Sequence, residues 1–142
     1  MNLENCQKEY DKLEKTIEAD INLKGNKLEP ALTSQPSLQR VWGTLAANVA
    51  GLYKDAEREV DEAAGHAYVA AQSDSYKSRN STDAKHFVDQ DPAYNDAIRK
   101  MNKVYRLKKQ VDSVCDVIES RKYVLKDLTA SIINQVNNTK LI

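Results

Sequence analysis

The chain has 142 residues, a length that fits one folded domain with a modest core of its own. Charged residues make up 30% of it and aromatic residues only 6%, a balance typical of long solvated helices rather than of sheets with many turns. The formal net charge is zero, so any affinity for nucleic acid must come from a local concentration of charge. Residues 97–142 carry ten basic against four acidic side chains, which places the basic charge in the C-terminal third.

Several classes of protein are disfavoured by the sequence. No apolar run approaches the roughly 18–20 residues that a membrane span needs, and the N-terminus has no apolar signal-peptide core, so we expect a cytoplasmic protein. The two cysteines, Cys6 and Cys115, have no second cysteine or paired histidine nearby, which indicates reduced packing residues rather than a metal or redox site. We therefore expect neither a metal nor another cofactor.

The first predicted helix covers residues 2–18, because its apolar residues recur at alternating steps of three and four. These residues are Leu3, Cys6, Tyr10, Leu13 and Ile17. Residues 19–37 contain Gly25, Pro30 and Pro36 and are predicted to form a connector.

A second helix is predicted over residues 37–73, with Ser37 as its N-cap. Its second half replaces large apolar residues by alanines and Gly65, so a packing partner must approach closely there. Residues 72–83 are polar and have no apolar periodicity, which predicts an exposed loop.

The third predicted helix begins at Asp91-Pro92, where an acidic N-cap precedes a proline in the first turn. Apolar positions then alternate in steps of three and four as in a coiled coil, over a helix of roughly 68 Å if it reaches residue 136. Such a seam is too long for the other two helices to cover alone, so we expect it to drive self-association, with Arg121 helping to set the register. The predicted oligomerisation residues are Val104, Leu107, Val111, Val114, Ile118, Arg121, Leu125, Leu128 and Ile132.

These elements predict an all-α protein of long amphipathic helices that assembles into an oligomeric bundle. We expect one helical domain over residues 1–142, with the N-terminal helices and polar loop in residues 1–83 and the C-terminal oligomerisation helix in residues 84–142. The spacing of the seam fits several coiled-coil orders and does not give the subunit number.

A basic cluster over residues 99–109 is the main candidate for binding DNA, since it holds six cations, one tyrosine and no acid. If all six cations neutralised phosphates of a single strand, the logarithm of the binding constant would fall with the logarithm of salt concentration at a slope of about −4. The alternative is that these cations form the solvated flank of a coiled coil. The cations are Arg99, Lys100, Lys103, Arg106, Lys108 and Lys109.

A second candidate lies in the polar loop, where Tyr76 stands beside Lys77 and near Arg79. An aromatic ring next to cations can stack on a base while the cations meet phosphates, although an ordinary solvated loop explains the same residues. His66 and His86 lack the spacing that metal ligation or nucleophilic catalysis needs. The sequence also has no phosphate-binding glycine loop or nucleophile elbow, so we expect no enzymatic activity.

Read from end to end, the chain resembles the UvsY recombination mediators of T-even-like phages. The resemblance begins in MNLENCQKE and DINLKGNKLE, continues in SDSYKSR and is most specific in DSVCDVIESRKYVLKDL. It implies a ring-like homo-oligomer, a heptamer in that family, which assembles through its C-terminal helices and binds single-stranded DNA without sequence preference. It further implies loading of a RecA-like recombinase onto DNA covered by single-strand DNA-binding protein, in the cytoplasm of a phage-infected bacterium.

One segment departs from the family pattern. The family has a Lys-x-Arg pair late in its middle helix that is implicated in DNA contact, whereas this chain has Ala70-Ala71-Gln72. Tyr76, Arg79, Arg121 and Lys126 match the family, and we hypothesise that the basic cluster of residues 99–109 compensates for the missing pair. The alternative function, from a different class, is a structural coiled-coil protein such as a phage assembly or scaffolding factor that binds no DNA.

Overall fold

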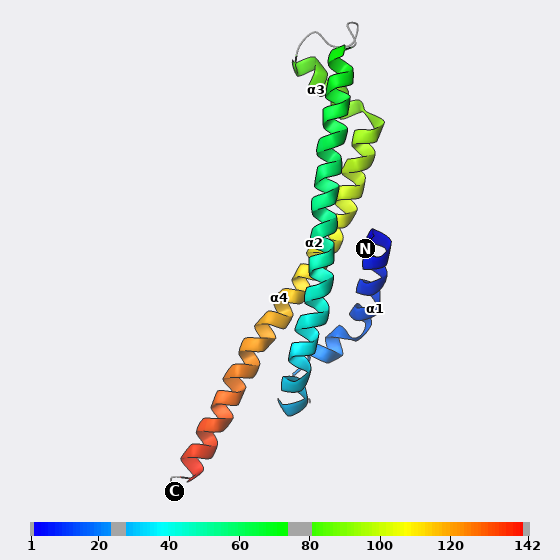
Figure 1. The fold of residues 1–142 in the computed structure, drawn as a ribbon. Coiled ribbons are helices and arrows are strands. Elements are labelled where there is room, and N and C mark those ends of the chain that lie inside the picture. Colours follow the sequence, from blue (N-terminus) through cyan, green and yellow to red (C-terminus); the bar gives the residue numbers. More distant parts are fainter. Residues whose placement is uncertain (1, 24–27, 74–80, 141–142) are drawn as a thin grey trace. The chain divides into compact units, whose positions relative to one another are not determined.

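The structure is a computed structural model that describes residues 2–23, 28–73 and 81–140. Its elements are α1 (Leu3–Ile21), α2 (Leu28–Ser73), α3 (Ser81–Gln90) and α4 (Pro92–Lys140), shown in Figure 1. No strand occurs in these described residues, which confirms the predicted all-α fold. None of the helices in them is sufficiently long and apolar to span a bilayer.

The predicted connector over residues 19–37 is largely wrong. Helix α1 continues to Ile21, and α2 already begins at Leu28, so Ser37 lies inside α2 rather than at its N-cap. Pro30 stands in the first turn, where its missing N–H costs no helical hydrogen bond, and Pro36 is tolerated inside the helix. The reason is tertiary packing, because the same stretch buries Ala31 and Gln35 to 4% and 5% exposure.

The predicted polar loop is shorter than residues 72–83. Gln72 and Ser73 end α2, Ser81 begins α3, and residues 74–80 lie outside the described part of the chain. In helix α3, Val88 is buried and Phe87 half-buried. Its first residues, Ser81, Thr82 and Asp83, are all polar, which is why they were predicted to belong to the loop.

The start of α4 agrees with the prediction from Asp91-Pro92. The backbone N–H of Tyr94 donates to Oδ2 of Asp91 at 2.9 Å, and the N–H of Asn95 donates to the Asp91 carbonyl at 3.0 Å. Asp91 is therefore the N-cap, and its charge is favourable at the positive end of the helix dipole.

Contacts divide the chain into two units, and both α2 and α4 contribute to each. One unit comprises residues 1–3 and 49–108, and the other comprises residues 4–48 and 109–142. In the second unit, Trp42 is 1% exposed and meets the ring of Tyr10 edge-on, with centroids 6.0 Å apart. In the first, α2 and α4 approach through small or branched residues that are at most 1% exposed, namely Val49, Ala56, Val104 and Leu107.

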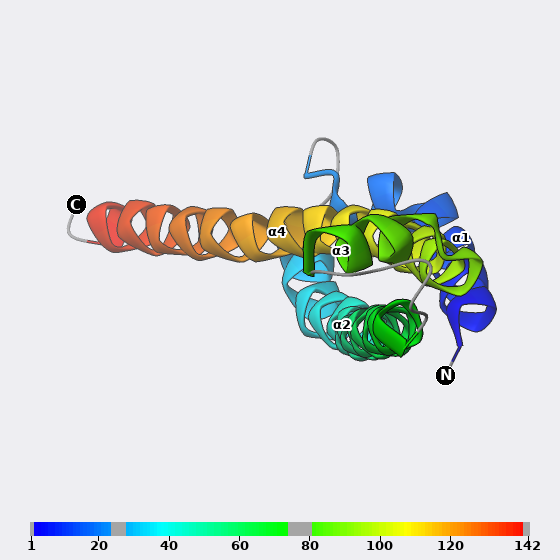
Figure 2. The same ribbon diagram turned by 90° about the horizontal axis from the view of Figure 1, so that it is seen from above.

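Among the described residues of its unit, the C-terminal part of α4 has no neighbouring helix. Figures 1 and 2 both show this part of α4 without α1 or the first half of α2 beside it. From residue 126 to residue 138, every side chain is exposed except the half-buried Thr129. This segment is therefore available to a partner.

Candidate nucleic-acid interface

Three of the six predicted cations form a stripe along the outer side of α4. Arg99, Lys103 and Arg106 are separated by steps of four and three, which bring their side chains to one side of the helix, and all three are exposed. The buried residues Val104 and Leu107 anchor the same turns on α2. The stripe, called the cationic stripe below, is thus held on a rigid helix.

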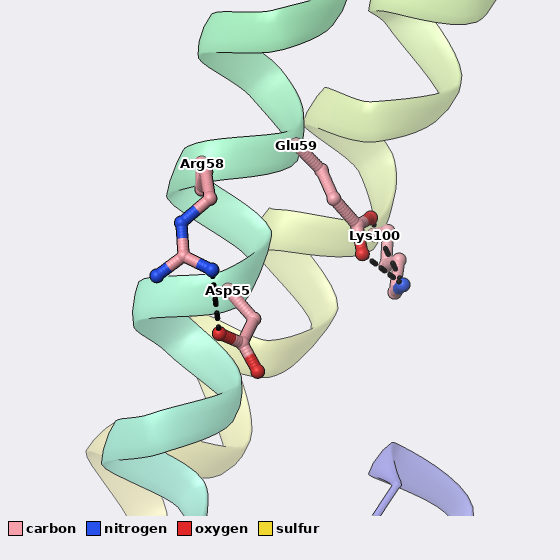
Figure 3. A network of polar contacts seen from close by, with 4 residues as sticks. All are labelled: Asp55, Arg58, Glu59 and Lys100. Carbon is pink, nitrogen blue, oxygen red and sulfur yellow. Dashed lines mark hydrogen bonds and ion pairs between the residues drawn. The ribbon is translucent and has the colours of Figure 1, made fainter.

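Lys100 is held within the chain instead. Its ammonium group donates to both carboxylate oxygens of Glu59 on α2, each at 3.0 Å, as Figure 3 shows. The side chains remain 53% and 47% exposed, so the pair is only moderately shielded from solvent. Nearby on α2, Arg58 pairs with Asp55 at 3.7 Å (Figure 3). A phosphate must compete with Glu59 for Lys100.

The members of the cationic stripe differ in their partners. Arg99 pairs with Asp96 at 2.7 Å, but both side chains are more than 70% exposed, and such surface pairs contribute little free energy. Lys103 and Arg106 have no ion pair or hydrogen bond to any residue that the structure describes. Of the six predicted cations, Lys103 and Arg106 are therefore the most accessible to a phosphate backbone.

The remaining predicted DNA-binding residues contribute less or are not described. Lys108 is half-buried and Lys109 exposed, and each has an interaction within the chain. Tyr105 is 43% exposed, and its ring lies 5.8 Å from that of Tyr53 on α2. Tyr76, Lys77 and Arg79 lie outside the described residues.

The residues of the predicted oligomerisation seam differ in how far they are buried within the single chain. Val104, Leu107, Val111, Ile118 and Leu125 are at most 2% exposed within the single chain, and Val114 is half-buried. Leu128 and Ile132 are 43% and 46% exposed. The seam therefore serves mainly as the core of the chain as far as Leu125, and its role in self-association stays a prediction.

A second set of apolar residues lies exposed on α4. Val117, Val124, Leu128 and Ile132 follow one another at steps of seven, four and four and are 43–46% exposed. These steps place the four side chains on one side of the helix. We call this set the apolar stripe, and only its last two members belonged to the predicted seam.

Arg121, predicted to lie in the seam, is 5% exposed in a polar contact with the start of α2. Its Nη1 donates to Oε1 of Gln35 at 2.8 Å and its Nη2 to Oγ of Ser34 at 3.4 Å, while its Nε has no partner in the described structure. Burial lowers the pKa of Arg121, and Asp20 partly offsets that effect. Sequence reasoning missed Gln35 and Ser34, since it assigned them to a connector.

No group of three or more His, Cys, Asp or Glu side chains that could hold a metal ion occurs among the described residues. Both cysteines are free thiols; Cys6 is buried and Cys115 half-buried. Burial is the main cause that raises the pKa of each thiol.

Comparison with known proteins finds no matching protein-family model, no matching curated protein and no matching solved structure. The described residues form an all-α arrangement of long helices, and the resemblance to the UvsY mediators stays a prediction.

Proposed function

We propose that this chain is a recombination mediator that binds single-stranded DNA as a homo-oligomer and helps to load a RecA-like recombinase onto DNA covered by single-strand DNA-binding protein. The observation that carries the proposal is the cationic stripe of Arg99, Lys103 and Arg106, which is exposed on a rigid helix and includes two cations without a partner among the described residues. A backbone of phosphates is the natural partner of such a stripe.

The three cations of the stripe imply weak binding by one copy. At about −0.7 per neutralised phosphate, they give a salt slope of roughly −2 per chain, half of the slope expected from all six cations. Several copies joined in one oligomer would present several stripes to the same strand, so that the later contacts become intramolecular. A chain of zero net charge can bind DNA in this way.

Self-association would use the apolar stripe of Val117, Val124, Leu128 and Ile132. Four large apolar side chains, each 43–46% exposed along one side of a helix, lose contact with water when they pack against another copy. The heptameric state expected from the resemblance is a proposal for this chain and rests on that resemblance alone.

The mediator itself would break and form no covalent bond. It would hold the strand by its phosphates so that the recombinase displaces the single-strand DNA-binding protein, and nucleotide hydrolysis would belong to the recombinase. Neither protein partner needs a catalytic group from this chain.

A structural coiled-coil protein without DNA binding is the second candidate. The apolar stripe favours it, because an exposed apolar side of a long helix serves a protein partner equally well. The pairing of Lys100 with Glu59 and of Arg99 with Asp96 also reduces the cationic surface available to DNA.

Fluorescence anisotropy of a labelled oligo-dT across a salt series, with the mass measured by light scattering on the same sample, separates the two candidates. The mediator proposal expects an oligomer whose affinity falls steeply with salt. An oligomer that does not bind the strand even at low salt would favour the structural coiled coil.

A further inference from the structure

A hollow of about 470 Å³ opens in the unit of residues 49–108, away from the cations discussed above. It lies where α2, α3 and the start of α4 meet. Two tyrosines, Tyr68 and Tyr94, are half-buried in its wall, and Lys85 and Asp89 of α3 stand exposed at it. Val88 of α3 is 8% exposed, and α2 contributes small residues, among them Gly65.

The walls of the hollow are held in place before any ligand arrives. The hydroxyl oxygen of Tyr68 accepts a hydrogen bond from Nε2 of Gln72 at 3.0 Å. The backbone of Tyr94 is fixed by the N-cap, since its N–H donates to the Asp91 carboxylate at 2.9 Å. Both rings are therefore carried by ordered helical turns, which lowers the entropy cost of binding.

The chemistry of the lining suits a flat ring with a polar edge. Aromatic rings and Val88 supply apolar walls, Lys85 supplies a hydrogen-bond donor and Asp89 an acceptor. Asp89 would repel a free anion. A purely aliphatic group could form no hydrogen bond with Lys85 or Asp89. Nucleobases combine a stacking face with donors and acceptors on their edge.

We propose that this hollow receives a nucleobase of the bound strand, which stacks on Tyr68 or Tyr94. The inference rests on the proposed function, since it names the second contact of the same strand. Both contacts belong to one unit, and Arg99 follows Tyr94 by five residues, about 7.5 Å of rise and roughly 140° of rotation around α4. A single strand that passes partly around α4 can thus place phosphates on the cationic stripe and a base in the hollow.

Gly65 allows the hollow to be filled without a clash. A Cβ at Gly65 would meet nothing within 4 Å, and leucine is a better helix former than glycine, so Gly65→Leu should fold while occupying the space of the base. Gly51→Leu is the matched control, because Gly51 lies on the same helix and in the same unit, has the same open space and does not line the hollow.

The test compares binding of oligo-dT with binding of an abasic oligonucleotide of the same length. We expect the wild-type chain to bind oligo-dT at least about fivefold more tightly than the abasic strand, as stacking of one base predicts. Gly65→Leu should lose this preference and keep its affinity for the abasic strand, whereas Gly51→Leu should keep both.

Each other result overturns the inference in a recognisable way. Equal wild-type affinity for the two strands, or a base preference that survives Gly65→Leu, would refute the base site and leave the proposed DNA binding standing. If the wild-type chain bound neither strand, the proposed function would fail together with the inference.

A second measurement on the wild-type chain does not depend on the variant's folding. Photocrosslinking with an oligonucleotide that carries 5-iodouracil should yield peptides modified at Tyr68 or Tyr94. Crosslinks confined to other residues would overturn the assignment.

Discussion

Arg121 and Gln35 form a buried polar pair that connects α4 to the beginning of α2. Nη1 of Arg121 donates to Oε1 of Gln35 at 2.8 Å, and Nε2 of Gln35 donates to the carbonyl of Ile118, also at 2.8 Å. Gln35 thus uses both ends of its amide on α4, although 86 residues separate it from Arg121. A buried cation here depends on neutral partners, which makes the pair sensitive to loss of either member.

Replacement of Gln35 by leucine should destabilise the fold, because it removes the shortest hydrogen bond of a buried guanidinium and leaves the volume filled. We expect a loss of about 2–3 kcal/mol in the free energy of unfolding, measured by urea denaturation. The double variant Gln35→Leu/Arg121→Met should recover most of this loss, since no buried charge remains. A double variant as unstable as Gln35→Leu alone would show that the charge is not the cause.

Neutralisation of Glu59 should strengthen DNA binding. Glu59→Gln releases Lys100 from its ion pair and so adds one available cation on α4, and the salt slope of oligo-dT binding should steepen by about 0.7. Stability should change by less than about 1 kcal/mol, since the pair is half exposed. Asp55→Asn, which removes one negative charge on the same helix and frees Arg58, is the matched control and should leave the slope nearer to that of the wild type.

Alkaline pH should weaken the fold through the thiols. Burial raises the pKa of Cys6 and Cys115 in the folded chain, and Asp112 and Asp116 raise that of Cys115 further. The unfolded chain therefore releases these protons first, so the stabilising effect is complete below the unfolded thiol pKa and is lost as pH rises above it. The free energy of unfolding should fall above about pH 8.5.

Burial, and then Glu14 and Glu57 respectively, raise the pKa values of Tyr10 and Tyr53. The fall in the free energy of unfolding should therefore continue above about pH 10. Cys115→Ala should make the decline between about pH 8.5 and 10 shallower, measured by urea unfolding at each pH. An unchanged profile in that variant would contradict the role given to Cys115.

Charge placed in the apolar stripe should dissociate the proposed oligomer. Val124 is 45% exposed in the single chain, so Val124→Glu should leave the helix content unchanged while it prevents another copy from packing there. Light scattering should then give a lower mass at the same concentration. Ala130→Glu is the control, because Ala130 is exposed on another side of α4 and should tolerate the charge. Equal masses for Val124→Glu and the wild-type chain would remove the apolar stripe from the interface.

The sequence predicted those parts of the fold that depend on local signals. Asp91-Pro92 correctly predicted the start of α4, and the three-four spacing after it predicted most of its length, although α4 continues beyond residue 136 to Lys140. The start of α2 was missed because Pro30 and Pro36 are local helix breakers, whereas the burial of Ala31 and Gln35 that outweighs them comes from distant residues.

The candidate site shows the same limit. Local composition identified every cation of residues 99–109, but it gave no sign that Glu59, 41 residues away, takes Lys100. The hollow around Tyr68 and Tyr94 was also missed, since no separate helix was predicted between the polar loop and Asp91, and residues of α3 complete the wall. In both cases the missing information was which helices lie beside each other.

The most direct test of DNA binding by the cationic stripe is the oligo-dT affinity of Lys103→Glu/Arg106→Glu at low salt, beside Lys12→Glu/Lys15→Glu. Both pairs are exposed, and both double variants change the net charge equally, but only the first alters the stripe. We predict that the stripe variant loses affinity by at least about tenfold and that its salt slope becomes shallower, while the α1 variant binds nearly as the wild type does. Equal affinity of the two variants would contradict the account.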